Sequence, residues 1–220
     1  MAEFGVMLGT WVYYWNSYLA AGLLVTMTTM VVATVITAVW ALFVVTLRLS
    51  GIWVLSTLAK AYIDFFRGTP VLVQLFLFFF VPSALGVVIP PWPTAVFVLT
   101  MHLGTFLAES YRSGYNAVPR GQREAAAAIG MSRWLALRRI IGPQALRAIV
   151  PAIGNVLVWM LLATPLTATI GTPELMYQAL IVQGRYYDFS VFALLTLIYA
   201  AIALLLGAGN MTLERRLRLP

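Results

Sequence analysis

The residues best suited to chemistry form a polar stripe within an apolar stretch of the chain. His102, Thr105 and Glu109 stand at i, i+3 and i+7, so a helix would present all three on one face. Such a stripe must face water or the interior of a bundle, because an unpaired polar group is costly in apolar surroundings. All three are therefore candidates for lining a polar path. A His102 that is hydrogen-bonded to the carbonyl of a neighbouring helix would give the same pattern.

A second candidate is the interrupted stretch formed by Gly68, Thr69 and Pro70. Pro70 lacks a backbone N–H and disturbs the carbonyl four residues earlier, at Phe66. Gly68 would let another group approach the backbone closely. Transporters build substrate sites from interrupted helices of this kind, but a simple packing kink is the alternative.

Enzymatic chemistry is not indicated anywhere in the sequence. It has no cysteine, no cluster of His, Asp and Glu at metal-ligand spacing, and no arrangement of Ser, His and acid typical of a hydrolase. It also lacks the G-x-x-x-x-G-K-[ST] phosphate loop, and Lys60 is the only lysine. We expect no catalytic residue, no bound metal and no ATP hydrolysis in this chain.

The elements that position these residues are expected to be membrane helices. Of the 220 residues, 62% are apolar and only 10% are charged, and the mean hydropathy is +0.92. Crossing the hydrocarbon takes about 20 apolar residues. Asp, Glu, Lys and Arg are absent from four long runs, at residues 4–47, 68–108, 148–173 and 189–213. The fold class is therefore predicted to be all-α, as one polytopic membrane domain over residues 1–220.

Five transmembrane helices are predicted from these runs and the residues that break them. They lie near Tyr18–Leu47, up to Val81, and near Pro93–Ala117, Ala148–Ala168 and Phe189–Asn210. The prolines between residues 82 and 93 divide the second helix from the third, because proline cannot continue a helix.

Basic residues predict the orientation of these helices. With five spans, all but one of the 14 Lys and Arg residues fall on one side of the membrane, and Arg185 alone falls on the other. Basic residues collect in short cytoplasmic loops. We expect the N-terminus outside and the C-terminus in the cytoplasm, with anionic lipid rather than nucleic acid beside the basic charge. Within the second helix, Asp64 and Arg67 are three residues apart and are expected to neutralise each other.

The segment between the third and fourth helices, residues 118–147, is too charged to enter the bilayer. Glu124–Ile129 is a short Ala-rich stretch of high helix propensity, which Gly130 ends. Ser132 is a plausible N-cap for a second short helix that contains Trp134. The segment is either an amphipathic linker on the lipid surface or a docking element for a cytoplasmic partner.

A family resemblance rests on three stretches of the sequence. The loop, VPRGQREAAAAIGMSRWLALRRIIGP, has the spacing E-A-A-x3-G-x9-I-x2-P in its residues Glu124, Ala125, Ala126, Gly130, Ile140 and Pro143. It resembles the cytoplasmic coupling loop of binding-protein-dependent ABC importer permeases. Two further stretches, AYIDFFRGTPVLVQLFLFFFVP and GTFLAESYRSGYNAVPRGQREAA, resemble the polar amino-acid branch of that family, which includes histidine, glutamine and arginine permeases.

This resemblance implies a permease subunit in a bacterial inner membrane. Its expected partners are an identical or similar second permease, two cytoplasmic ATPase subunits that bind ATP and Mg²⁺, and a substrate-binding protein outside. The loop would insert into the ATPase, and the polar residues of the bundle would form the path of an amino acid. Glu109 would then meet its ammonium group or a cationic side chain.

One departure from the family bears on the substrate. Many relatives carry a polar Lys-Asp-Thr-Ser run just before Ile170, where this chain has Leu162, Ala163, Thr164 and Pro165. Two alternatives to an ATP-driven importer remain open. One is an ion-coupled transporter with His102 or Glu109 as proton relay, and the other is a structural subunit of a membrane complex.

Overall fold

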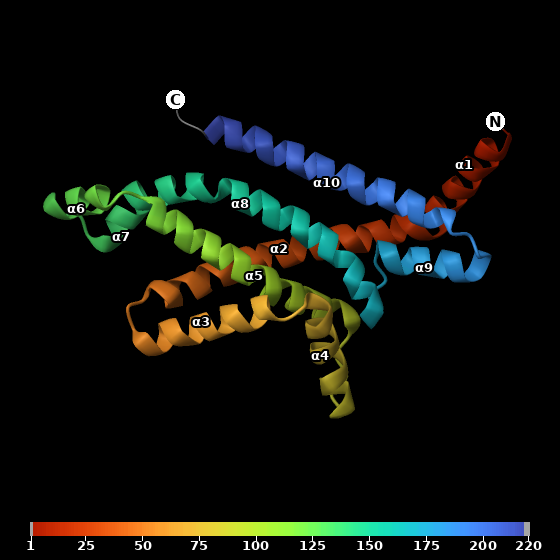
Figure 1. Cartoon of the computed structure of the whole chain (residues 1–220), viewed down its shortest axis with the longest axis horizontal. Helices are drawn as coiled ribbons and strands as arrows, with labels where there is room; N and C mark the ends of the chain where they lie inside the picture. Colours follow the sequence, from red (N-terminus) through yellow and green to blue (C-terminus); the bar gives the residue numbers. More distant parts are fainter. Residues whose placement is uncertain (1, 218–220) are drawn as a thin grey trace.

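The computed structural model describes residues 2–217, and the side chains of residues 7–216, as a set of helices joined by short connections. No strand occurs in this range, which confirms the predicted all-α class. Figure 1 shows the long helices running in the same general direction. The elements are α1 (Ala2–Tyr14), η1 (Trp15–Leu19), α2 (Ala20–Leu49), α3 (Trp53–Gly68), α4 (Val71–Ala84), α5 (Pro91–Ala117), α6 (Arg120–Ala128), α7 (Arg133–Ala136), η2 (Leu137–Ile141), α8 (Gly142–Ala163), η3 (Thr164–Ile170), α9 (Leu175–Tyr186) and α10 (Ser190–Leu217).

The first helix begins well before the predicted Tyr18. Helical structure runs without a break from α1 through the π-helical turn η1 into α2. Contacts with a distant segment hold this early part in place. The Tyr14 hydroxyl donates to Asp188 at 2.9 Å, and the Tyr13 and Tyr18 hydroxyls meet that of Tyr186 at 3.1 and 3.2 Å.

Asp188 joins this contact to the start of α10. Its other carboxylate oxygen accepts from the backbone N–H of Ser190 at 2.9 Å. Partial burial raises the pKa of Asp188, and the hydrogen bonds from Ser190 and Tyr14 lower it. The hydrogen bonds together have the larger effect, so the pKa of Asp188 lies below its ordinary value. The side chain is therefore a carboxylate at neutral pH and can hold both segments.

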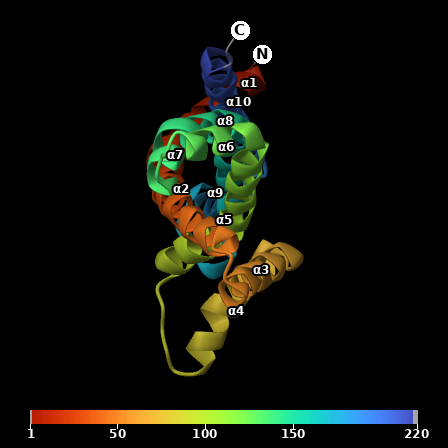
Figure 2. The same ribbon diagram turned by 90° about the vertical axis from the view of Figure 1, so that its left-hand side faces the viewer.

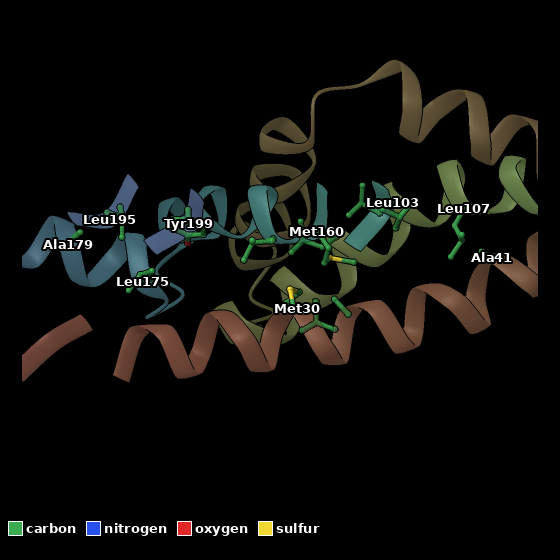
Figure 3. Packing of buried hydrophobic residues seen from close by; sticks show 14 of the residues in the cluster. Met30, Ala41, Leu103, Leu107, Met160, Leu175, Ala179, Leu195 and Tyr199 are labelled. Atoms are coloured by element: carbon green, nitrogen blue, oxygen red, sulfur yellow. The ribbon is translucent and has the colours of Figure 1, made fainter. Parts of the chain in front are cut away.

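The centre of the bundle is α5, which packs between α2 and α8. Its buried face joins one long apolar cluster with residues from both neighbours. Figure 3 shows Met30 of α2 and Met160 of α8 within this cluster, and Leu103 and Leu107 of α5 farther along it. Figure 2 shows α3 and α4 on one side of this central group and α10 on the other. The central helix α5 carries the polar stripe of His102, Thr105 and Glu109.

The predicted second helix is two helices at a sharp angle. α3 ends at Gly68, α4 begins at Val71, and their axes differ by 104°. The interruption lies at the predicted residues, but it was expected within one helix. Residues 69 and 70 have extended backbone angles, which separate two helices rather than kink one.

Three described helices are long and apolar enough to cross a membrane, at Met7–Leu49, Arg133–Ile170 and Ser190–Arg216, and the bent α3–α4 pair would make a fourth. The 27-residue α5 is also long enough, but its polar residues reduce its hydropathy. The count of five spans stays a prediction.

Helix α9 was not predicted from the sequence. It has 12 residues, too few to cross a bilayer, so a search for apolar runs misses it. The sequence does hold two local signals for this helix, the glycine at 171 and the acidic residue at 174. In the structure Gly171 has φ of +86°, and Glu174 caps the helix by accepting from the N–H of Tyr177 at 2.8 Å. The fully buried Glu174 also accepts from the Tyr199 hydroxyl at 3.0 Å. This contact ties α9 to α10.

The crossing of α5 and α8 predicts the effect of adding one methyl group. A Cβ at Gly114 would meet the Ile149 side chain and lie 2.9 Å from the backbone oxygen of Ala145, which cannot move without moving α8. We expect Gly114→Ala to lower the free energy of unfolding by about 1–3 kcal/mol, measured as loss of thermal stability in detergent. The control Gly207→Ala, whose Cβ meets nothing within 4 Å, is expected to be neutral or stabilising. Equal effects of the two would contradict close packing at Gly114.

Candidate functional site

The break between α3 and α4 is stabilised by the side chain of Gln74. Because Pro70 has no N–H, the Phe66 carbonyl lacks its helical donor, and the Gln74 Nε2 donates to it at 2.8 Å. The same Nε2 lies 3.0 Å from the Thr69 carbonyl oxygen and 2.7 Å from its hydroxyl oxygen. The predicted disturbance at Phe66 is thus confirmed. Gln74, which is buried, was not predicted as a site residue. It is eight residues from Phe66 in the sequence, and only the bend between α3 and α4 brings the two together.

The three predicted residues of the break itself lie near the surface. Gly68 and Pro70 are exposed and Thr69 is half-buried. A Cβ at Gly68 would meet nothing within 4 Å, so none of the described residues makes the close approach that the glycine suggested. A role of these residues in a substrate path stays a prediction.

The polar stripe of α5 is divided by its surroundings. His102 and Glu109 are half-buried, each in a hollow of the surface. Thr105 has no exposed surface, and its hydroxyl donates to the His102 carbonyl at 2.7 Å. The imidazole lies against the backbone of Phe66, while its Nδ1 is buried without a hydrogen-bond partner among the described residues. Two of the three residues therefore line an open space in this chain.

The charges around Glu109 are arranged differently from the prediction. Arg112 donates to the Glu109 Oε2 from Nε at 3.0 Å and from Nη2 at 2.6 Å. Asp64 and Arg67 do not form an ion pair, which corrects the expectation that they neutralise each other; Glu109–Arg112 is the only pair in the described part of the chain. The Arg67 guanidinium instead lies 4.8 Å from the centre of the Phe106 ring.

Two hollows, each of about 400 Å³, adjoin each other on the surface formed by α5 and α8. We call the first the charged hollow and the second the apolar hollow. The charged hollow is lined by Arg67, Phe106, Glu109, Ser110, Arg112, Ser113, Ala152, Asn155, Val156 and Trp159. The apolar hollow is lined by Val71, His102, Leu103, Phe106, Trp159, Leu162, Ala163 and Leu166.

Phe106 and Trp159 line both hollows. Their rings meet edge to face with centroids 5.3 Å apart. Neither was predicted as a site residue. Asn155 and Trp159, at i and i+4, share one face of α8 and were the available signal. Leu162 and Ala163, the first two residues of the stretch that departs from the family resemblance, contribute to the apolar hollow. After them the chain continues from α8 into the 3₁₀ helix η3, which has Pro165 in its first turn.

The loop between α5 and α8 folds as two short helices, α6 and α7, followed by η2. Gly130 ends α6 with φ of +76°, and the Ser132 hydroxyl caps α7 by accepting from the N–H of Leu135 at 3.3 Å, as predicted. α6 begins at Arg120, earlier than predicted. Arg123 attaches α6 to the end of α5, because it donates to the Tyr115 carbonyl at 2.6 Å and lies 4.3 Å from the centre of the Tyr115 ring.

The loop motif divides into buried and exposed residues. Ala126 packs with Val118, Ala136 and Ile141 in a small apolar cluster, with Ile140 half-buried beside it. The remaining motif residues are exposed, and they are Glu124, Ala125, Gly130 and Pro143. The most exposed large apolar side chains of the segment are Ile129 at 74% and Trp134 at 70%. The loop therefore has its own core and leaves an apolar surface uncovered.

Comparisons with known proteins agree with one another. A family model described as "Binding-protein-dependent transport system inner membrane component" matches residues 49–219. The probable amino-acid ABC transporter permease YckA of Bacillus subtilis (strain 168) is 36% identical over 195 residues, which are 88% of this chain and 84% of the relative. The glutamine transport system permease GlnP of Escherichia coli (strain K12) is 33% identical over 175 residues, 78% of this chain and 80% of the relative.

Solved structures give the same result for the fold. A chain from the crystal structure of an amino acid ABC transporter with histidines is similar with a TM-score of 0.88 and 32% identity, covering 96% of this chain and 97% of that chain. A chain of the inward-facing MetNI methionine ABC transporter has a TM-score of 0.76 and 20% identity, covering 91% and 96%. The second likeness shows the fold alone.

Gln74 provides a test of the bent pair. Gln74→Leu removes the donor to the Phe66 and Thr69 carbonyls, and leaving a buried acceptor unpaired costs about 1–3 kcal/mol. We expect a lower melting temperature of the purified protein. The control Gln144→Leu removes a single bond, from Gln144 Nε2 to the Ile140 carbonyl, and should have a smaller effect. A Gln74→Leu protein as stable as the wild type would show that the bend does not need this side chain.

Proposed function

The chain belongs to the family of binding-protein-dependent transport system inner membrane components, and from this premise we propose that it is the permease subunit of an ATP-driven importer of amino acids. The relatives named as amino-acid or glutamine permeases support this substrate class. The single observation that carries the proposal is the helical loop at residues 118–147, which forms a separate cluster and exposes an apolar surface.

The proposed topology has the N-terminus outside and the C-terminus in the cytoplasm of a bacterial inner membrane. The arrangement in Figure 1 supports it, because α6 and α7, the connection from α2 to α3 and the end of α10 lie toward the same end of the molecule. Arg185 lies near the opposite end, in α9. Basic residues of the loop and of the end of α10 thus lie at the end opposite to α9, an arrangement that agrees with the positive-inside rule.

The loop is the proposed contact with the ATPase subunits. Ala126 fixes α6 to the loop's own core, and this leaves Glu124, Ala125 and Ile129 free to enter a cleft on a partner. ATP and Mg²⁺ would be bound by that partner, because the sequence has no phosphate loop. Closure of two ATPase subunits would move this loop and with it α5 and α8.

The proposed solute path runs along the two hollows. They lie open on one side of this chain, where Trp159 is 45% and Leu162 is 52% exposed, which supports a second permease, identical or similar, as the other wall. His102 and Glu109 would line the path, and Gly68, Thr69, Pro70 and Thr105 would shape it from behind. A substrate-binding protein would deliver the solute at the outer end.

A pull-down from the native membrane tests the loop contact. We expect the wild-type chain to retain a phosphate-loop ATPase in detergent and Glu124→Arg to lose at least about 90% of it, because one unfavourable charge at a docking site costs about 1.4 kcal/mol or more. Glu124 is exposed, so the variant should fold. Asp64→Arg, the same type of change at an exposed site on α3, should retain the ATPase.

The two alternatives give different results. An ion-coupled transporter would carry no ATPase, and its uptake would collapse with a protonophore at constant ATP. A structural subunit would show neither uptake nor bound solute. Absence of an ATPase from the wild-type pull-down would refute the importer.

A further inference from the structure

We propose that the paired hollows form one amino-acid site, in which the charged hollow holds the α-carboxylate and α-ammonium groups and the apolar hollow holds an uncharged, apolar side chain. This inference rests on the proposed function and adds the substrate class. It opposes the cationic side chain that Glu109 alone suggested from the sequence.

The charged hollow has the groups that a zwitterion needs. Arg67 makes no hydrogen bond or ion pair with any described residue, and its only recorded contact is with the Phe106 ring. An unpaired guanidinium in a hollow is suited to a carboxylate, which it binds through two parallel hydrogen bonds. Both bonds from Arg112 go to the Oε2 of Glu109. The other oxygen of Glu109 can accept from the ammonium group.

The balance of charge disfavours a second cation. Two guanidinium groups and one carboxylate line the charged hollow, those of Arg67, Arg112 and Glu109. Glu109 is already paired with Arg112, so the ammonium group of one substrate uses the remaining capacity. A cationic side chain here would face a net positive surface without a carboxylate of its own.

The apolar hollow selects the side chain. Seven of its eight lining residues are apolar or aromatic, and the exception is His102. An ionised side chain would lose its hydration there with no partner of opposite charge, whereas an apolar one would be removed from water favourably. The volume of about 400 Å³ falls within the usual size of small-molecule sites.

Phe106 and Trp159 connect the two hollows. Because both residues line both spaces, a molecule with a charged head and an apolar tail can occupy them together, passing over the pair of rings. His102, whose ring centre is 5.6 Å from that of Phe106, marks the start of the apolar hollow. Its buried Nδ1 has no described partner.

The test is binding to the whole transport complex, purified with its ATPase and placed in lipid nanodiscs. Three probes are compared: L-leucine, 3-methylbutylamine, which is leucine without its carboxylate, and L-lysine. We expect L-leucine to bind at least about tenfold more tightly than either of the others, the equivalent of one well-placed interaction. Lysine binding equal to or tighter than leucine binding would overturn the inference.

Two variants separate the hollows. Arg67→Gln should remove most of the difference between L-leucine and 3-methylbutylamine, and Arg67→Lys should restore part of it. Leu162→Glu places a carboxylate in the apolar hollow and should reverse the preference to L-lysine. The matched controls are Arg215→Gln on α10 and Leu180→Glu on α9, which lie outside both hollows and should leave the order of affinities unchanged.

Failure of the substrate class and failure of the proposed function give different results. A complex that carries the ATPase and shows no difference among the three probes, or whose Leu162→Glu variant keeps the wild-type order, refutes the paired-hollow site and leaves the importer standing. A chain that carries no ATPase and supports no ATP-dependent uptake refutes the importer itself.

Discussion

A polar group inside a membrane protein must find its partner within the protein, and the architecture of this chain depends on that constraint. The clearest case is the Phe66 carbonyl, which Pro70 deprives of its helical donor and which Gln74 then pairs at 2.8 Å. Together with the contacts of Gln74 to Thr69, this hydrogen bond stabilises the break at which α4 leaves α3 at 104°. On either side of this bend, Arg67 lies beside Phe106 and Val71 lines the apolar hollow.

The same constraint explains how the charges of α5 are used. Glu109 and Arg112 are three residues apart on one helix and satisfy each other. Arg67 comes from another element and contacts a ring instead of a carboxylate. The fold therefore keeps one guanidinium available at the edge of an apolar space. Such a site can distinguish between ligands in two ways. It favours a ligand that pairs with the free guanidinium, and it disfavours one that would place an unpaired charge in the apolar space.

The two ends of the molecule are stabilised by different kinds of contact. At one, Tyr14 and Asp188 join the first helix to the last through hydrogen bonds between segments far apart in sequence. At the other, α6 and α7 pack mainly on their own small core and are attached to α5 by Arg123. A loop with its own core can transmit force as a unit, which suits the proposed contact with an ATPase.

The sequence by itself determined the features that depend on neighbours along the chain. Apolar runs predicted the helices, Gly130 and Ser132 predicted the end of α6 and the cap of α7, and Pro70 predicted the disturbance at Phe66, because each is a local consequence of backbone chemistry. Only the tertiary structure decided the partners. Gln74 pairs with the Phe66 carbonyl, and Thr105 is buried. Arg67 contacts the Phe106 ring instead of Asp64. Trp159 also packs against Phe106. These contacts depend on how helices cross, and the spacing of residues within one helix carries no information about which neighbour it will meet.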